Sequence, residues 1–256
     1  MNEENLNIRL ASVEDIAKIV SLVRTSFNDL YLTASIYKCF GIEKFICNEI
    51  ENEYSPYKYF IAEINNYIVG FIEFKMFYDS SVAFLNMIAT DNTFKGKGVA
   101  GKFFKYTKEY FFDLGFKSIQ LDVFSSNTVA LNWYTSMGFE KKEAENFYKY
   151  SKTDLLNEQF KQDLVITNYS NFKCLYDHFG FSFLQLTFNN QNLNIGIINN
   201  NAIVRDILPD SECYAIIYTV LKQKNINSLY YIGKDDLRLH DVFTKIDEIN
   251  RMKLIF

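Results

Sequence analysis

Glycine and lysine residues gather between Phe94 and Lys102, in the sequence Phe-Lys-Gly-Lys-Gly-Val-Ala-Gly-Lys. An apolar, strand-like run precedes this segment (residues 82–89), and apolar residues at helical spacing follow it (residues 103–114). A glycine-rich turn between a strand and a helix suits phosphate, because glycines admit close backbone approach and the helix start offers unpaired N–H groups. The segment therefore predicts a phosphate-binding loop.

Two common phosphate loops can be compared with this spacing. A Walker A loop requires G-x-x-x-x-G-K-[ST], and Gly96, Gly98 and Gly101 do not stand at those offsets. The same glycines fit the dinucleotide pattern G-x-G-x-x-G, and Asp122 lies about where such sites carry an acidic residue. The strand before the loop belongs to a predicted meander, and the three lysines exceed what a dinucleotide pyrophosphate usually requires. These features disfavour a dinucleotide, although the spacing alone allows one.

The loop also resembles a motif of a known family. Residues 95–100 (Lys-Gly-Lys-Gly-Val-Ala) resemble the [Q/R]-x-x-G-x-[G/A] loop with which GNAT acyltransferases bind the pyrophosphate of acetyl-CoA. Lys95 departs from the pattern, which has Gln or Arg at this position. A lysine keeps a cation there but supplies a point charge in place of a planar donor.

A second motif lies downstream, at residues 121–139. It resembles the second GNAT signature, in which a strand is followed by an Asn, an Ala three residues later, a Tyr, and a Gly-Phe pair that ends the helix. The matching residues are Asn127, Ala130, Tyr134, Gly138 and Phe139. Two motifs in the right order are more specific than either alone. The resemblance covers about residues 7–150 and is nearest in pattern to protein N-terminal and ribosomal-protein acetyltransferases.

The resemblance implies a set of residues that bind acetyl-CoA. Backbone groups of one strand segment would pair with pantetheine, amides of the loop would hold the pyrophosphate, and an Asn side chain would bind the pantetheine arm. The implied residues are Ile88, Ala89, Thr90, Lys95, Gly96, Lys97, Gly98, Val99, Ala100, Gly101 and Asn127. Asn127 also precedes a predicted helix, so an N-cap is a strong alternative role for its side chain.

The resemblance also implies catalytic residues. Tyr134 would protonate the departing CoA thiolate, which suits a phenol that stays protonated at neutral pH. The alternative is a buried structural tyrosine, in a chain that has 18 of them. Asp122 matches the position of a carboxylate general base, Glu73 on the preceding strand is a rival, and Glu63 is a weaker one. A strand carboxylate on the solvent face is the alternative for Asp122.

Composition narrows the function classes. The chain has 256 residues, a net charge of −4 and 48% hydrophobic residues, which favour a folded core and disfavour a nucleic-acid partner. Four scattered cysteines and two distant histidines predict neither disulfides nor a metal site. The polar N-terminus and the lack of an 18-residue apolar run predict no signal peptide and no membrane span, hence a cytoplasmic protein.

The predicted fold class is α/β (α+β), with the order β-α-α-β-β-β-α-β-α-β over residues 1–150. This is the GNAT fold, with a mixed, mostly antiparallel central sheet flanked by helices. One helical region is predicted over residues 34–53, a hairpin turns at Asn65-Asn66, and a final strand pair occupies residues 139–150.

A polar linker is predicted at residues 151–162, followed by a smaller α+β domain at residues 163–256. Its pattern looks like a shortened echo of the first domain, and an unrelated small domain is the alternative. The turn at residues 205–210 has no glycine and two carboxylates, so this half is expected to bind no cofactor. Near its end, a helix is predicted over Asp236–Ile249 and a strand over Met252–Phe256.

These observations predict an acetyl-CoA-dependent N-acetyltransferase that needs no metal and acts by direct attack of a primary amine. The acceptor is an amine-bearing small molecule, a protein N-terminus or a lysine, and the sequence does not choose among them. The alternatives are a non-catalytic acyl-CoA-binding or sensing module and a scaffold with a retired site. An exposed sheet edge or the C-terminal unit offers a route to a homodimer.

Overall fold

A computed structural model describes residues 6–152, 164–188, 191–205, 211–234 and 240–256. The first half contains β1 (Asn7–Leu10), α1 (Ile16–Ser26), α2 (Asp29–Leu32), α3 (Ile42–Glu51), β2 (Tyr57–Ile64), β3 (Tyr67–Phe77), β4 (Val82–Thr90), α4 (Val99–Asp113), β5 (Ser118–Phe124), α5 (Thr128–Ser136) and β6 (Glu140–Tyr150). The second half contains β7 (Leu164–Ile166), α6 (Tyr169–Phe179), β8 (Phe181–Phe188), β9 (Gln191–Ile198), β10 (Asn201–Val204), α7 (Ser211–Gln223), β11 (Ser228–Gly233) and β12 (Phe243–Ile255).

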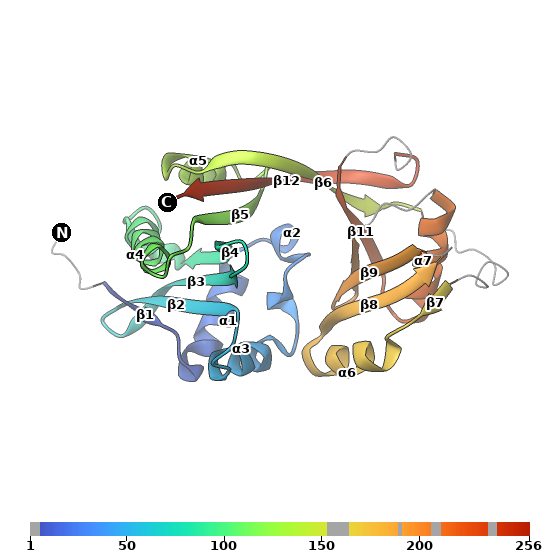
Figure 1. The fold of residues 1–256 in the computed structure, drawn as a ribbon, viewed down its shortest axis with the longest axis horizontal. Coiled ribbons are helices and arrows are strands. Elements are labelled where there is room, and N and C mark those ends of the chain that lie inside the picture. The colour runs from blue at the N-terminus through green and yellow to red at the C-terminus, as the bar shows by residue number, and fades with distance from the viewer. Residues whose placement is uncertain (1–5, 153–163, 189–190, 206–210, 235–239) are drawn as a thin grey trace.

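The twelve described strands form one sheet, in the order β1-β2-β3-β4-β5-β12-β6-β11-β10-β9-β8-β7. From either edge toward the centre, five strands of one half are followed by the long strand of the other half. The two halves therefore exchange their central strands, β6 and β12, which bridge them in Figure 1. The second half repeats the strand arrangement of the first, as the sequence echo predicts.

The first half confirms the predicted element order and the hairpin. β2 and β3 pair across Asn65 and Asn66, whose φ angles are 51° and 63°. Asparagine tolerates this left-handed region better than most side chains, so the residue type fits the turn. The helical region expected over residues 34–53 is divided, because α3 begins only at Ile42, after a short 3₁₀ turn.

Two other expectations are wrong. Residues 139–150 do not fold back as a strand pair: β6 is one continuous strand, because β12 and β11 supply its partners. The helix expected over Asp236–Ile249 is absent from its described part, where β12 begins at Phe243. Two irregularities interrupt the register of β12 with β6: Ile246 of β12 is an extra residue between Lys245 and Asp247, and Lys142 of β6 is an extra residue opposite Arg251 and Met252. A strand with such bulges loses its period of two in sequence. The described residues do not include residues 153–162 of the predicted linker, residue 163, residues 206–210 of the predicted turn, or residues 235–239.

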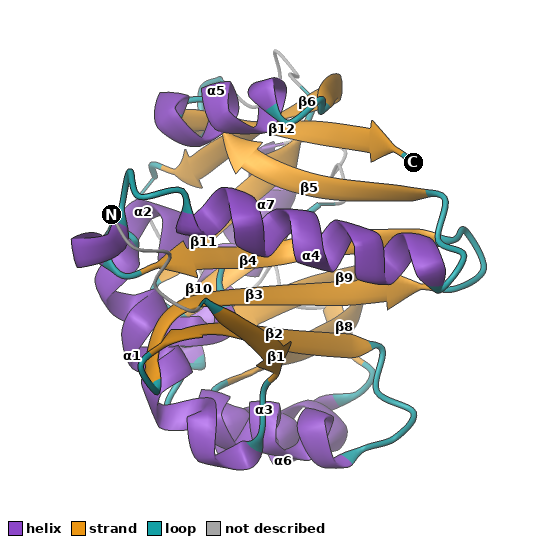
Figure 2. Ribbon diagram, turned by 90° about the vertical axis from the view of Figure 1, so that its left-hand side faces the viewer, coloured by secondary structure: helices purple, strands orange, loops and turns teal. Residues whose placement is uncertain are grey.

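Two apolar cores cover opposite faces of the first half of the sheet. One contains α4 side chains such as Phe103 and Phe104, and the other contains α1 and α3 side chains such as Ile19 and Ile46. α4 therefore lies on one face, and α1 and α3 lie on the other (Figure 2). A ligand bound between two strands of this half would therefore have α4 on one side and α1 and α3 on the other.

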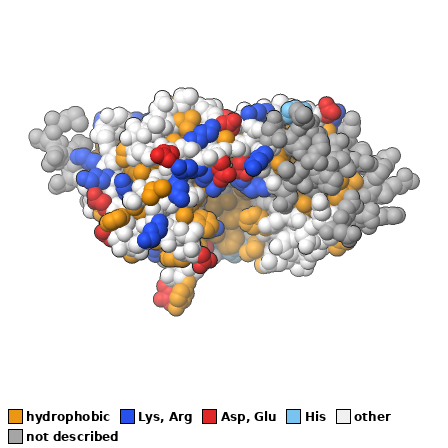
Figure 3. Space-filling model, turned by 45° about the horizontal axis from the view of Figure 1, so that its top comes forward, with side chains coloured by type: hydrophobic (Ala, Val, Ile, Leu, Met, Phe, Trp, Pro, Cys, Tyr) orange, Lys and Arg blue, Asp and Glu red, His pale blue; other side chains and the backbone are white. Residues whose placement is uncertain are grey.

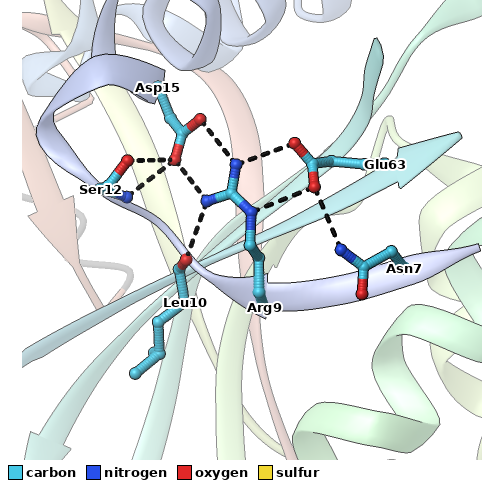
Figure 4. A network of polar contacts seen from close by, with 6 residues as sticks. All are labelled: Asn7, Arg9, Leu10, Ser12, Asp15 and Glu63. Atoms are coloured by element: carbon cyan, nitrogen blue, oxygen red, sulfur yellow. Dashed lines mark hydrogen bonds and ion pairs between the residues drawn. The ribbon is translucent and has the colours of Figure 1, made fainter. Parts of the chain in front are cut away.

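An ion-pair network fixes the first strand to the first helix (Figure 4). Arg9 on β1 contacts Asp15 at 2.7 Å and Glu63 on β2 at 2.8 Å, and Ser12 donates two hydrogen bonds to Asp15. Glu63 therefore neutralises Arg9 at the sheet edge. This arrangement favours a structural role for Glu63 over the weaker base role that the sequence allows.

Candidate functional site

The strands β4 and β5 separate in the middle of the sheet. They pair in parallel only from Val82 to Leu85 and from Ser118 to Leu121. Beyond this point β4 stays paired with β3 as far as Thr90, whereas β5 pairs with β12. No described strand pairs with the β5-facing edge of residues 86–90. Alternate residues of a strand direct N–H and C=O groups to each edge, so this opening presents backbone donors and acceptors.

A bulge lies where the opening begins. Glu73 of β3 faces Met87 of β4, whereas Phe74 faces Leu85, so Asn86 is the extra residue. A bulge bends its strand and leaves one residue out of the ladder. The bulge thus coincides with the separation of β4 from β5.

The glycine-rich loop follows the other end of this edge. Gly96 and Gly98 have φ angles of 74° and 80°, and Gly98 immediately precedes α4. A Cβ added to either glycine would meet no atom within 4 Å, so the space above the loop is open. The first N–H groups of α4 have no partner within the helix and point toward this space. Lys95 and Lys97 are both exposed beside it.

The Asn127 side chain caps α5. Its Oδ1 accepts a hydrogen bond from the Ala130 amide at 3.2 Å. The helix-capping role is therefore present, and it engages the carbonyl oxygen of the side chain. The amide Nδ2 is the group that remains for a ligand.

Tyr134 lies on α5, with 7% of its surface exposed. Its ring contacts Trp133 and Phe139 at centroid distances of 5.0 and 5.5 Å. It belongs to the same core as Ile88 on the open edge of β4. Burial raises the pKa of the Tyr134 phenol, which keeps the hydroxyl protonated. No hydrogen bond joins this hydroxyl to another described residue.

Asp122 is the first β5 residue beyond the pairing with β4, and it forms a bidentate ion pair with Arg251 of β12. Arg251 Nε donates to one carboxylate oxygen and Nη2 donates to the other at 2.9 Å. The guanidinium carbon lies 5.1 Å from the centre of the Phe84 ring. The guanidinium therefore occupies a hydrogen-bonding position on each carboxylate oxygen of Asp122.

Glu73 is buried on the side of α1 and α3, with 3% of its surface exposed. The Tyr37 hydroxyl donates to one carboxylate oxygen, and Asn86 Nδ2 donates to the other at 2.8 Å. Burial raises the pKa of Glu73 above its ordinary value, and the two hydrogen bonds oppose that shift. Tyr59 faces Glu73 from β2, and its buried hydroxyl has no hydrogen-bond partner in the described part of the chain.

The two carboxylates and Tyr134 lie on opposite faces of the sheet. Ile119, Leu121 and Val123 of β5 pack against the α4 core that contains Tyr134, so Asp122 points to the other face by alternation. Glu73 points to that same face. The opening between β4 and β5 therefore has proton acceptors on one side and a proton donor on the other.

Comparison with protein families identifies this arrangement. Residues 20–139 match the family model described as "Acetyltransferase (GNAT) family". This part of the chain is therefore similar to the GNAT acetyltransferases. The matched residues run from α1 to the end of α5 and include the loop, the open edge, Asn127 and Tyr134.

Solved GNAT structures share the fold of the whole chain. A tandem GNAT protein from the clavulanic acid biosynthesis pathway is 8% identical, with a TM-score of 0.72 and 98% of both chains covered. A GCN5-related N-acetyltransferase from Sphaerobacter thermophilus is 7% identical, with a TM-score of 0.66, and covers 98% of this chain and 95% of its own. At these identities the likeness shows the fold alone. A search of curated proteins finds no match.

The second half lacks the open edge of the GNAT domain in its described part. β10 pairs with β11 over all of Asn201–Val204, and Arg205 then contacts Glu145 of β6 at 2.7 Å. β4 continues over residues 86–90 beyond its pairing with β5, whereas β10 ends at Val204, where its pairing with β11 also ends. Residues 206–210, which follow Arg205, lie outside the described residues.

Three further observations concern metal ligands, long apolar helices and cysteines. No group of three or more potential metal ligands occurs among the described residues. No described helix has the length and hydropathy needed to cross a membrane. Cys39 and Cys213 are buried and no disulfide links the four cysteines, all of which are described.

Sequence reasoning missed three residues of this site. Asn86 is the one polar residue in the apolar run 82–89, and that interruption was a usable signal. Tyr37 lies among many aromatic residues and carried no signal. Arg251 was hidden because its strand is bulged and lies 129 positions from Asp122 in the chain.

The buried Glu73 carboxyl gives a testable pH dependence. Because its pKa is raised on folding, its stabilising contribution is present below its ordinary pKa and is lost as the pH rises through the raised value. We expect the melting temperature of Glu73→Gln, relative to the wild type, to increase between about pH 4 and pH 8. Thermal unfolding at a series of pH values measures this difference.

The exposed Glu53 provides the control, since Glu53→Gln removes one carboxylate without changing a buried group. A constant difference between Glu73→Gln and the wild type across this pH range would show that Glu73 titrates as an ordinary exposed carboxyl.

Proposed function

We propose that the GNAT domain transfers the acetyl group of acetyl-CoA to a primary amine by direct attack in a ternary complex. The observation that carries this proposal is the unpaired edge of residues 86–90, which ends at a glycine-rich helix start. An extended pantetheine arm would add to this edge as a strand adds to a sheet. The pyrophosphate would then reach the N–H groups at the start of α4.

The proposed cofactor residues are those that the sequence resemblance implies. Ile88, Ala89 and Thr90 would supply backbone hydrogen bonds, and residues 95–101 would surround the pyrophosphate. Asn127 would donate through Nδ2 while its Oδ1 caps α5. Lys95 and Lys97 are exposed on the same loop and would add favourable charge for the phosphates.

The reaction would proceed in one displacement. The amine nitrogen attacks the thioester carbonyl carbon, the carbonyl oxygen takes negative charge, and the C–S bond then breaks. A backbone N–H near the β4 bulge would stabilise the oxyanion. The amine proton passes to Glu73 or Asp122, and the thiolate takes a proton from Tyr134. Holding both reactants in the opening would supply much of the rate enhancement.

Of the two proton acceptors, we assign the general-base role to Glu73 because of its contact with Asn86. Asn86 joins Glu73 to the bulge, where the thioester would lie, whereas both carboxylate oxygens of Asp122 already accept hydrogen bonds from Arg251. Because Glu73 is buried, the proton would reach it through a water molecule at the bulge, while Asn86 would hold the carboxylate in place. Asp122 would then orient the amine electrostatically beside Arg251.

The proposed activity is tested by measuring CoA thiol release from acetyl-CoA in the presence of primary amines. Release that depends on the amine, with an acetylated product in mass spectrometry, supports the transferase. Acetyl-CoA binding without release on any amine would instead support the non-catalytic binding module.

Replacement of Tyr134 by Phe tests the proposed acid. We expect kcat to fall at least about tenfold, because the departing thiolate loses its proton donor. The ring and its packing stay, so the Kd for acetyl-CoA should remain within about twofold. Steady-state kinetics and calorimetry measure the two quantities.

Tyr106→Phe on α4 is the matched control, because Tyr106 is largely exposed and its loss should leave both quantities unchanged. An unchanged kcat for Tyr134→Phe would remove the acid role or place a slower step after the chemistry.

A further inference from the structure

The proposed function fixes where the acceptor must approach. The phosphates would lie at the loop after Thr90, so the acyl group would lie near Asn86, where β4 and β5 separate. On the α4 face, this position is covered by the core that contains Tyr134 and Val99. The proton acceptors Glu73 and Asp122 lie on the opposite face, so the acceptor amine is expected to approach from that face.

The segment from Asp29 to Glu51 covers that opposite face. At its start, the Tyr31 ring stacks on Phe124 of β5, with a centroid distance of 5.2 Å and an interplanar angle of 18°. The Tyr31 hydroxyl lies 3.2 Å from Ser126 Oγ, and Ser126 in turn donates to Asp247 of β12. Tyr31 thus fastens the segment to the end of β5 and to the exchanged strand.

The same segment is fastened to the second half of the chain. The Gly41 amide donates to the Phe179 carbonyl at 3.2 Å, and Cys39 Sγ contacts the Gly180 carbonyl at 3.4 Å. A Cβ at Gly41 would lie 2.5 Å from the His178 carbonyl oxygen, so only glycine fits this contact. Phe45 of α3 packs edge-on against Phe181 at 5.1 Å. These contacts hold the segment from the side that faces away from the sheet.

The acceptor side is consequently enclosed by three parts of the chain. The sheet forms one side, the segment from Asp29 to Glu51 forms another, and the second half stands opposite (Figure 1). Figure 3 shows the surface hollowed between the two halves, with apolar side chains in the recess and charged side chains along its border. A protein substrate needs an open groove, because several residues of its chain must lie beside the reacting amine.

We propose that the acceptor of this GNAT domain is a small-molecule amine that enters the recess between the two halves, and not the N-terminus or a lysine of a protein. This inference rests on the proposed acetyl transfer. The second half then has a function without a cofactor: it closes the acceptor side and limits the size of the amine.

Conjugates that join CoA to an amine through an acetyl bridge test the size limit without knowledge of the natural acceptor. Calorimetry compares three probes: CoA, a conjugate with ethylamine, and a conjugate with the N-terminus of a decapeptide. We expect the ethylamine conjugate to bind within about tenfold of CoA and the peptide conjugate to bind at least about 100-fold more weakly. A peptide conjugate that binds within about tenfold of CoA would overturn the proposal. A lack of CoA binding would refute the proposed function itself, so the two failures are distinguishable.

Tyr31→Ala removes the attachment at the β5 side and provides a second readout. We expect this variant to lower the ratio of the Kd of the peptide conjugate to the Kd of CoA at least about tenfold. The Kd of CoA itself should stay the same. Tyr54→Ala is the control, because Tyr54 follows α3 and is 83% exposed. The contacts at Gly41 remain in this variant. The same ratio of the two Kd values in the wild type and in Tyr31→Ala would contradict the attachment role of Tyr31.

Discussion

Deletion of residues 243–256 is expected to prevent the first 150 residues from folding into a stable GNAT domain. β12 lies between β5 and β6 and pairs with both, so its loss exposes two strand edges in the middle of the sheet. It also removes Met252 and Leu254 from the core that contains α4. The truncated chain should therefore aggregate or lack a cooperative unfolding transition. Circular dichroism and thermal unfolding measure this loss.

Point substitutions on β12 test the same claim without removing the strand. Met252 is 2% exposed in the core of the first half, whereas Ile255 on the same strand is 66% exposed. We expect Met252→Ala to lower the free energy of unfolding by about 2–5 kcal/mol. Ile255→Ala should cost no more than about 0.5 kcal/mol. Equal effects of the two substitutions, or a stable and cooperatively folded truncation, would show that the first half folds without its exchanged strand.

Substitution of Gly98 by Asp should weaken acetyl-CoA binding at least about tenfold, and more at low ionic strength. The new carboxylate would stand at the start of α4, where the phosphates are expected and where the added Cβ meets open space. Repulsion between like charges in this loop, together with side-chain bulk, accounts for the loss. Calorimetric titration of the variant with acetyl-CoA measures it.

Gly115→Asp is a closely matched control. Gly115 has a φ of 81°, and a Cβ there also meets open space, but it follows the opposite end of α4. Both substitutions therefore impose similar backbone strain, and only one places a charge in the loop. Equal binding by Gly98→Asp and Gly115→Asp would move the pyrophosphate away from this loop.

The sequence could predict the parts of the fold whose signals are local. The Asn65-Asn66 turn, the glycines before α4 and the Asn127 cap each depend on a few neighbouring residues, and the structure places each of them where the sequence indicates. The positive φ angles of Gly96 and Gly98 explain why glycine occurs there.

The parts that could not be predicted depend on contacts between distant residues. β12 pairs with strands that are distant in the sequence, and its bulge at Ile246 disguises the alternation that marks a strand. The Asp122–Arg251 ion pair follows from that pairing, so the sequence offered Asp122 as a base without its partner. Similarly, Glu73 differs from an ordinary strand carboxylate only because Tyr37 and the helices bury it.

The exchanged strands also change how the chain can be divided. A boundary at residues 151–162 separates the two halves along the sequence, and it remains a proposal. In space, however, β6 pairs with β11 and β12 of the second half, and β12 pairs with β5 and β6 of the first half. Expression of residues 1–150 alone is therefore a poor route to an active GNAT domain, and the full chain is the form to assay.

Calorimetric titration of the full chain with acetyl-CoA, with NADH titrated in parallel, tests the central claim most directly. The structure has one open strand edge next to a glycine-rich helix start among its described residues, so we predict acetyl-CoA binding at one site per chain and no binding of NADH. Binding of NADH in place of acetyl-CoA would move the loop to the dinucleotide class. Two acetyl-CoA sites would contradict the silent second half, and binding of neither compound would contradict the assignment of this opening as a cofactor site.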